Sequence, residues 1–234
     1  MSNVKGVIEA WTQEVFCDLF AVRLIGAAFT LAFIDLLWML GLMRDGNELQ
    51  SNSDHPCTAL RLREQKNLLQ RDGWWQSLSG LPTGHIPLIE RLAAIDVTKN
   101  VDVDIGESRK IARSVHRAFE TLLQPIRDAV DASTSALRRA NAAKEFADRR
   151  EEIEECLVNG IVPSALIGRD RRPHPVSIIN AAYAFQLARL PELMTKLDGP
   201  DPWKPSDRMK WRTKVESWTM KALEDYQILS NQRR

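Results

Sequence analysis

The sequence predicts an all-α protein, an irregular helical bundle organised around one central apolar helix. Three observations favour this fold class. Apolar residues recur three and four positions apart along much of the chain, which is the spacing of one helix face. Residues that cap or stop helices separate these stretches. The one alternating segment, VDVDI at 101–105, is too short and isolated to predict a sheet.

Four helices are predicted in the first part of the chain. Gly26 is expected to mark a bend or a close helix contact, and residues 74–84 are expected to form a loop because they are rich in Gly, Pro and Ser. The predicted helices are residues 4–22, 24–43, 58–71 and 87–96.

Three helices are predicted in the second part: a long one from 104 interrupted at Pro125, one at 177–197, and an amphipathic one capped by Ser206. We therefore divide the chain into a helical module at 1–96 and a helical bundle at 104–234. The last helix has an apolar face that must dock on the protein or on a partner. Tryptophan is enriched at interfaces, so Trp74-Trp75 and the Trp211/Trp218 stripe are the predicted contact surfaces.

The segment from Leu24 to Met43 has about the 20 apolar residues that span a bilayer. Asp35, near its middle, would cost roughly 2.5–3.5 kcal/mol in lipid on insertion scales. A helix that is apolar on all sides is either buried in protein or spans a membrane. We interpret the segment as a buried central helix and keep the membrane span as the alternative.

Composition excludes some classes of function. Lys plus Arg number 32 and Asp plus Glu number 31, so no overall positive field attracts nucleic acid. The three cysteines are widely spaced and include no CxxC, which fits neither a disulfide framework nor a cysteine zinc site. The N-terminus shows no signal-peptide core. These features predict a cytoplasmic protein that does not bind nucleic acid.

The motifs HExxH, GxSxG, GxxxxGK[ST] and GxGxxG are all absent from the chain. What remains is one helical pair, Glu14 and Asp18, which stand four positions apart and so share a helix face. Like charges at this spacing cost about 0.2–0.5 kcal/mol unless a cation or donor lies between them. From the pair alone, two solvated carboxylates on the outer edge of an amphipathic helix are the favoured interpretation.

The surrounding order of segments adds a second reading. The segment EVFCD, which carries Glu14 and Asp18, is followed by an apolar helix, a polar loop and the segment HPCTALRL, which carries His55 and Arg61. This order resembles the gluzincin zinc peptidases of the heat-shock and CAAX-prenyl endopeptidase type. In those enzymes an ExxxD helix follows the HExxH helix, and an HPxxxxR segment comes later. The resemblance covers about residues 9–70.

The resemblance implies a role for each matched residue. Glu14 corresponds to the third zinc ligand, and Asp18 to the carboxylate that orients a ligating histidine. His55 and Arg61 correspond to polar residues beside the bound peptide and the zinc. With Glu14 as the metal ligand, Asp18, His55 and Arg61 are therefore the candidate catalytic residues.

The chain departs from the family pattern in one respect: the two histidine ligands and the general-base glutamate should precede Glu14, and no histidine does. A catalytic zinc needs three protein ligands and an open position. Zinc is thus expected only if another segment or chain supplies the histidines. A fragment of a longer enzyme, a split subunit and a degenerate scaffold all remain open.

We therefore predict a C-terminal helical portion, or a degenerate relative, of a zinc metallopeptidase that is inactive as this chain alone. The alternative is a non-enzymatic helical protein–protein interaction module. The first reading requires the four matched residues to converge in space, whereas the second leaves them scattered. A missing N-terminal layer would also expose apolar surface around Trp11, Val15 and Leu19, so a protein partner or a homo-oligomer is expected.

Overall fold

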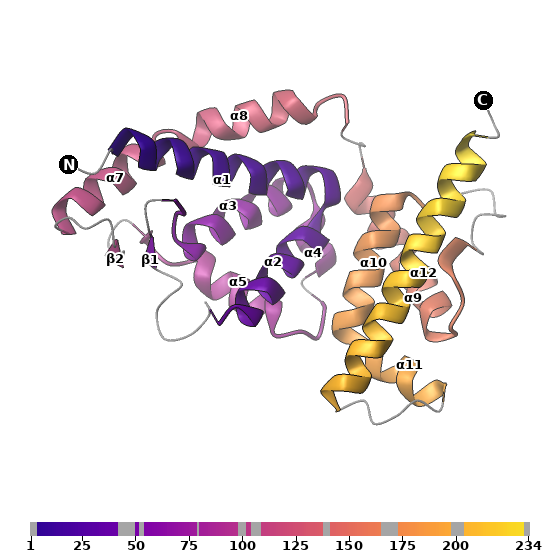
Figure 1. Ribbon diagram of the computed structural model, residues 1–234. Coiled ribbons are helices and arrows are strands. Elements are labelled where there is room, and N and C mark those ends of the chain that lie inside the picture. Colours follow the sequence, from indigo (N-terminus) through magenta and orange to yellow (C-terminus); the bar gives the residue numbers. More distant parts are fainter. Residues whose placement is uncertain are drawn as a thin grey trace. The chain divides into compact units, whose positions relative to one another are not determined.

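The computed structural model describes nine ranges of the chain: residues 4–41, 50–51, 54–78, 80–97, 102–103, 109–137, 141–164, 173–197 and 204–231. Within these ranges the protein is helical apart from two two-residue strands, which confirms the predicted all-α class (Figure 1). The chain divides into two compact units. The first unit contains Met1–Trp75 and Gly84–Arg138, and the second contains Gln76–Thr83 and Arg139–Arg234.

The first unit is built around the long helix α1, which packs against α2, α3, α7 and α8. Figure 1 shows α8 running along one side of α1 and α3 along another. The helices of this unit, with α4 at its margin, are α1 (Val4–Ile25), α2 (Ala27–Met39), α3 (Thr58–Arg71), α4 (Trp74–Leu78), α5 (His85–Ala93), α7 (Arg109–Glu120) and α8 (Leu123–Thr134).

The apolar face of α1 is covered by its own chain. Trp11 and Val15 are fully buried and Leu19 is 2% exposed. The Trp11 ring lies 4.7 Å from the His116 ring and 5.5 Å from the Phe119 ring, both on α7. The expectation that this surface would be exposed was therefore wrong, because α7 and α8 fold back over it. The boundary between the compact units accordingly falls near residue 138 rather than between 96 and 104.

The predicted bend at Gly26 separates α1 from α2. Gly26 has φ +82°, and a Cβ placed there would lie 2.7 Å from the Trp74 ring. The residue therefore combines a positive φ with a close contact to the Trp74 ring of α4, and only glycine meets both requirements without strain.

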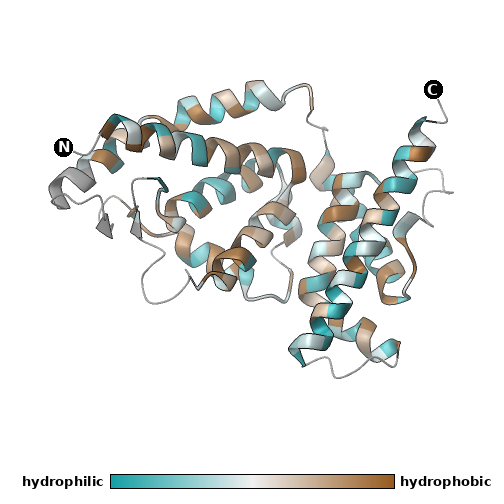
Figure 2. Cartoon of the chain, viewed as in Figure 1, coloured by the Kyte–Doolittle hydropathy of each residue, from teal (hydrophilic) through white to brown (hydrophobic). Residues whose placement is uncertain are grey.

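Because α1 ends immediately before Gly26, the apolar segment does not form the single helix predicted from 24 to 43. It forms the 13-residue helix α2. Residues 42 and 43 lie outside the described ranges. The helix buries Leu31, Ile34 and Leu37 on one face and exposes Trp38 and Met39 at its C-terminal end. Figure 2 shows the hydrophobic colouring of the ribbon. Among the described residues, no helix has the length and hydropathy needed to cross a membrane.

A short parallel ladder joins β1 (Gln50–Ser51) to β2 (Asp102–Val103). The VDVDI segment was not expected to form a sheet, so this two-residue strand corrects the prediction. Periodicity could not reveal it because its partner strand lies 52 residues earlier in the chain, with Gln50 paired to Asp102. The ladder also places the Ser51 hydroxyl 3.1 Å from Nε2 of the buried His116.

Buried ion pairs connect the helices of the first unit. Arg23 on α1 has a side chain only 3% exposed and bonds to Asp72 and Asp131. Burial alone would lower the pKa of Arg23, but the two carboxylates raise it above its usual value. Arg127 on α8 reaches the buried Glu64 on α3 at 2.6 Å. These ion pairs fix the positions of α1, α3 and α8 relative to one another.

The stability of the first unit should depend on pH through His116. Burial, aided by the charge of Arg63, lowers the pKa of His116 to about 4 from its usual 6.5. Between these pH values the unfolded chain binds the proton and the folded protein does not. The free energy of unfolding should therefore fall by about 3 kcal/mol as the pH drops from about 6.5 to about 4.

Urea unfolding of the wild type and of His116→Gln over this pH range measures the effect, because glutamine cannot titrate. The difference between the free energies of unfolding of the two proteins should change by most of this roughly 3 kcal/mol between pH 6.5 and about pH 4. Parallel curves for the two proteins would contradict the assignment.

The described residues of the second unit after position 140 form four α-helices, with α10 packed between α9 and α12. The predicted helix at 177–197 is two helices that break at Arg189, two residues before Pro191, because a proline removes a backbone donor. The predicted cap Ser206 was wrong, since the last helix already begins at Pro205, a residue favoured at the first helical position. The four helices are α9 (Ala142–Val158), α10 (Pro175–Ala188), α11 (Leu190–Lys196) and α12 (Pro205–Asn231).

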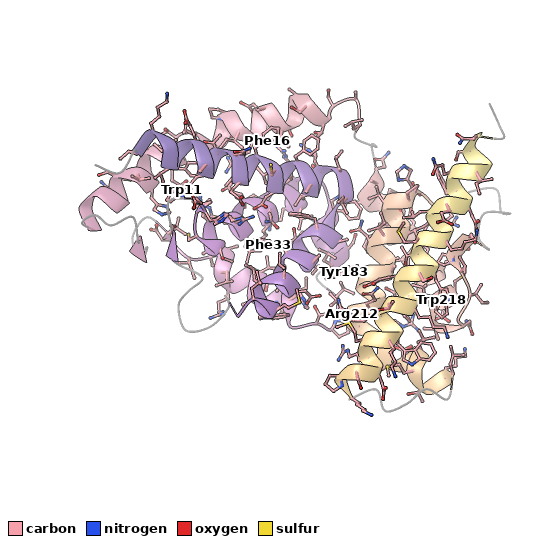
Figure 3. The ribbon with its side chains drawn as sticks, viewed as in Figure 1. Trp11, Phe16, Phe33, Tyr183, Arg212 and Trp218 are labelled. Carbon is pink, nitrogen blue, oxygen red and sulfur yellow. The ribbon has the colours of Figure 1, made fainter. Side chains whose placement is uncertain are left out.

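The tryptophans predicted to form contact surfaces differ in burial. Trp74 and Trp75 are 4% and 8% exposed and lie in the helix α4, so both the predicted loop and the predicted surface at this point were wrong. On α12, Val215 and Ala222 are fully buried, and α12 packs on α10. Trp218, labelled in Figure 3, is half-buried, with the Lys214 ammonium 5.7 Å from its ring centroid.

Candidate functional site

The four residues matched from the sequence converge in the first unit. Glu14 and Asp18 lie one turn apart on α1, and Arg61 lies in the first turn of the neighbouring helix α3. His55 precedes α3 by three residues. Together with Gln65 and Phe33 they form what we call the Arg61 cluster. Side-by-side packing of α1 and α3 is what brings positions 14 and 61 together.

A bidentate ion pair forms the inner part of the Arg61 cluster. Arg61 Nε donates to Asp18 Oδ2 at 2.7 Å, and Arg61 Nη2 donates to Asp18 Oδ1 at 2.8 Å. The Asp18 side chain is only 6% exposed, and Gln65 donates a further hydrogen bond to it at 3.2 Å. Both oxygens of Asp18 are thus engaged, and the carboxylate holds Arg61 in one orientation.

The outer part of the Arg61 cluster reaches the surface. Arg61 Nη2 lies 3.0 Å from Glu14 Oε2, and His55 Nδ1 lies 3.4 Å from Glu14 Oε1. The side chains of Glu14 and His55 are 33% and 54% exposed, against 15% for Arg61. Glu14 is therefore anchored from inside by Arg61 and presents its other oxygen next to the imidazole.

Electrostatics favour the charged form of Arg61 despite its burial. Burial by itself would lower the pKa of Arg61, but the hydrogen bonds and charge of Asp18, with the charge of Glu14, raise it above its usual value. The guanidinium also lies over the Phe33 ring of α2, 4.5 Å from the ring centroid. Figure 3 labels Phe33. The guanidinium is thus a fixed positive charge between two carboxylates.

Two members of the Arg61 cluster were not identified from the sequence. Gln65 stands four residues after Arg61, so the helical spacing that linked Glu14 to Asp18 could also have identified it. Phe33 was assigned only to the apolar helix, because nothing in its neighbourhood indicates a cation contact. Its role depends on how α2 packs against α3.

The Arg61 cluster does not by itself complete a zinc site. Across the residues that the structure describes, no three His, Cys, Asp or Glu side chains are grouped so as to hold a metal ion. Glu14 fits as one ligand, with an accessible oxygen and a fixed orientation. The donors present are too few for a catalytic zinc, which takes three from the protein.

A second feature of the first unit is an apolar groove between α1 and α8, with a volume of about 520 Å³. Its α1 residues recur at helical spacing from Ile8 to Phe16 along a different stripe from Glu14 and Asp18, so the groove lies on a different face of α1 from the Arg61 cluster. Phe16, labelled in Figure 3, is among its lining residues. The others include Ile8, Thr12, Leu122, Pro125 and Ala129.

No protein-family model, curated protein or solved structure matches this chain.

Proposed function

We propose that this chain is the helical portion of a gluzincin-type zinc metallopeptidase, or a degenerate relative of one, in which Glu14 is a zinc ligand. The observation that supports this proposal is the convergence of Glu14, Asp18, His55 and Arg61, within 3.4 Å from one to the next. The residues come from two separate segments that match the family pattern in order. The packing of α1 on α3 brings the two segments together.

In this proposal the inner residues position the outer ones. Asp18 fixes Arg61, and Arg61 in turn orients the Glu14 carboxylate through Oε2. A preoriented ligand loses less conformational entropy when a metal binds. Asp18 therefore acts on Glu14 through Arg61, which differs from the direct contact to a ligating histidine that the resemblance implied.

The remaining parts of the catalytic site must come from elsewhere. The sequence contains no HExxH, so two histidine ligands and a general base would be supplied by another segment or another polypeptide. In such enzymes the zinc activates a water molecule for attack on the peptide carbonyl. The contribution of this chain is to hold and orient one ligand and to place His55 beside it.

The isolated chain should not hydrolyse peptides, because general-base catalysis needs the absent glutamate and the missing ligands. Fluorogenic peptide substrates with added zinc, with and without a chelator, measure this. Chelator-sensitive cleavage that co-purifies with the chain through several columns and vanishes in Glu14→Gln would show a complete site and contradict our account.

The proposal itself is tested by recovering the protein from its native cells with an affinity tag. We expect a polypeptide containing HExxH, continuous with this chain or bound to it, together with bound zinc and peptidase activity. Glu14→Gln should reduce that activity by more than about 100-fold, and Asp18→Asn by about 10–100-fold. Glu9→Gln, on the exposed side of the same helix, is the matched control and should match the wild type. Recovery of the chain with no HExxH polypeptide would exclude a working peptidase, and the further absence of bound zinc would reject the proposal that Glu14 is a zinc ligand.

A second candidate function is a non-enzymatic helical interaction module, and the apolar groove between α1 and α8 is the observation that favours it. The two candidates depend on different side chains. Retention of a protein partner that is lost in Phe16→Glu but unchanged in Glu14→Gln would favour the interaction module.

A further inference from the structure

We propose that a cavity between α1, α3 and α8 binds a small carboxylate that carries an apolar body. The cavity has a volume of about 270 Å³ and lies within the first unit. It shares no residue with the Arg61 cluster, so this proposal does not rest on the proposed function. Its carboxylates are occupied, its hydrogen-bond donors are in excess, and its floor is apolar.

The walls of the cavity come from one face of α3 and one face of α8, and both helices pack on α1. Two ion pairs join the walls. Arg127 on α8 bonds to Glu64 on α3 at 2.6 Å. Arg71 on α3 bonds to Asp131 on α8 at 2.9 Å. Asn67, which also lines the cavity, stands on α3 between the two ion pairs.

The carboxylates beside the cavity already accept hydrogen bonds from arginines. Glu64 Oε1 accepts from Arg63 Nε at 3.2 Å. Glu64 Oε2 accepts two hydrogen bonds from Arg127, from Nε at 2.9 Å and from Nη2 at 2.6 Å. Asp131 Oδ1 accepts from Arg71 Nη2 at 2.9 Å. The negative charges at the cavity are therefore compensated, and they do not exclude an anionic ligand.

Donors remain on the walls once these bonds are counted. Among the described residues, Arg71 has Asp131 as its one hydrogen-bond partner, through Nη2, which leaves its Nε and Nη1 groups. The Asn67 amide has no partner in the described part of the chain. Arg127 Nη1 donates to Gln124 at 3.2 Å and keeps a second N–H. An ionised carboxylate only accepts hydrogen bonds, so it is the group that complements these donors.

The floor of the cavity selects the rest of the ligand. Leu19 from α1, Leu68 from α3 and Val130 from α8 line it, and all three are buried. A bare inorganic anion would leave this apolar surface uncovered, whereas an aliphatic or aromatic body would cover it. The volume is just below the roughly 300–1,000 Å³ of pockets for drug-sized molecules. The ligand is therefore a small amphipathic carboxylate.

The test is a calorimetric titration of the whole chain with hexanoate, hexanamide and acetate. Hexanoate carries both the carboxylate and an apolar body, and it should bind at one saturable site. Hexanamide lacks the charge and should bind at least about tenfold more weakly, because hydrogen bonds to a charged group are roughly twice as strong. Acetate lacks the apolar body and should also bind at least about tenfold more weakly, since each buried methylene contributes up to about fourfold.

Substitutions at Asn67 should move the affinity in opposite directions, and this exposed side chain can be changed without disturbing the core. Asn67→Lys should tighten hexanoate binding by about threefold or more, and Asn67→Asp should weaken it by a similar factor. Arg71→Gln should weaken it by at least about tenfold. Arg91→Gln, at an exposed position on α5 outside the cavity, is the matched control and should bind as the wild type does. Circular dichroism checks that each variant is folded.

Several results would overturn the proposal. These are the absence of saturable hexanoate binding, equal affinities for hexanoate and hexanamide, and equal affinities of Asn67→Asp and Asn67→Lys. Loss of binding in Phe16→Glu with no effect of Arg71→Gln would instead locate the ligand in the apolar groove between α1 and α8. Glu14→Gln should bind hexanoate as the wild type does, so the peptidase proposal and this one fail in different variants.

Discussion

Replacing Arg61 with methionine is expected to lower the free energy of unfolding by about 3–5 kcal/mol. The substitution leaves the Asp18 carboxylate, 6% exposed, without its bidentate partner. An ionised carboxylate that loses its charged partner in the protein interior keeps a desolvation penalty, which the one hydrogen bond from Gln65 offsets only in part. Urea unfolding followed by circular dichroism measures the loss.

Two matched variants show whether the cost comes from the unpaired charge. The double variant Asp18→Leu with Arg61→Met should recover most of the lost stability, because apolar side chains of similar volume often replace a buried ion pair without cost. Lys5→Met removes the exposed partner of Glu9 and should change stability by less than about 0.5 kcal/mol. A loss below about 1 kcal/mol for Arg61→Met would mean that Asp18 reaches water, in contradiction to the described geometry.

Gly26→Ala is expected to destabilise the protein by about 2–5 kcal/mol, from two additive causes. A residue with a Cβ costs about 1–2 kcal/mol at the positive φ of +82°. Its Cβ would also lie 2.7 Å from the buried Trp74 ring, and overpacking of this kind costs about 1–3 kcal/mol. Thermal or urea unfolding of the variant measures the sum.

Gly41→Ala separates the two causes. Gly41 has a similar φ of +70°, but an added Cβ would meet nothing within 4 Å. It should therefore show only the conformational cost of about 1–2 kcal/mol. Equal losses for the two variants would mean that the Trp74 ring moves away without cost.

The retention of a buried ion pair is itself informative about the Arg61 cluster. Such pairs seldom stabilise a fold more than well-packed apolar residues do. In this protein the pair connects a buried carboxylate to the accessible Glu14 through one guanidinium. The function that we propose would give this ion pair a role in positioning Glu14.

The sequence by itself determined the local features of the protein. Periodicity predicted the helix from Thr58 to Arg71 with the bounds that the structure shows, and it predicted the first helix as 4–22 where the structure has Val4–Ile25. The glycine at position 26 indicated the bend. The spacing of four put Glu14 and Asp18 on one face. These features depend on neighbours within a few residues, which a single sequence shows directly.

The tertiary structure decided which apolar faces meet. Several stripes of similar hydrophobicity compete for the face of α1, and only three-dimensional packing selects α7 and α8 to cover it. The same packing buries Trp74 and brings Phe33 to Arg61 and Gln65 to Asp18. It also leaves Glu14 Oε1 3.4 Å from His55 Nδ1. Contacts between distant segments depend on shape and volume, which the spacing of residues along the chain does not encode.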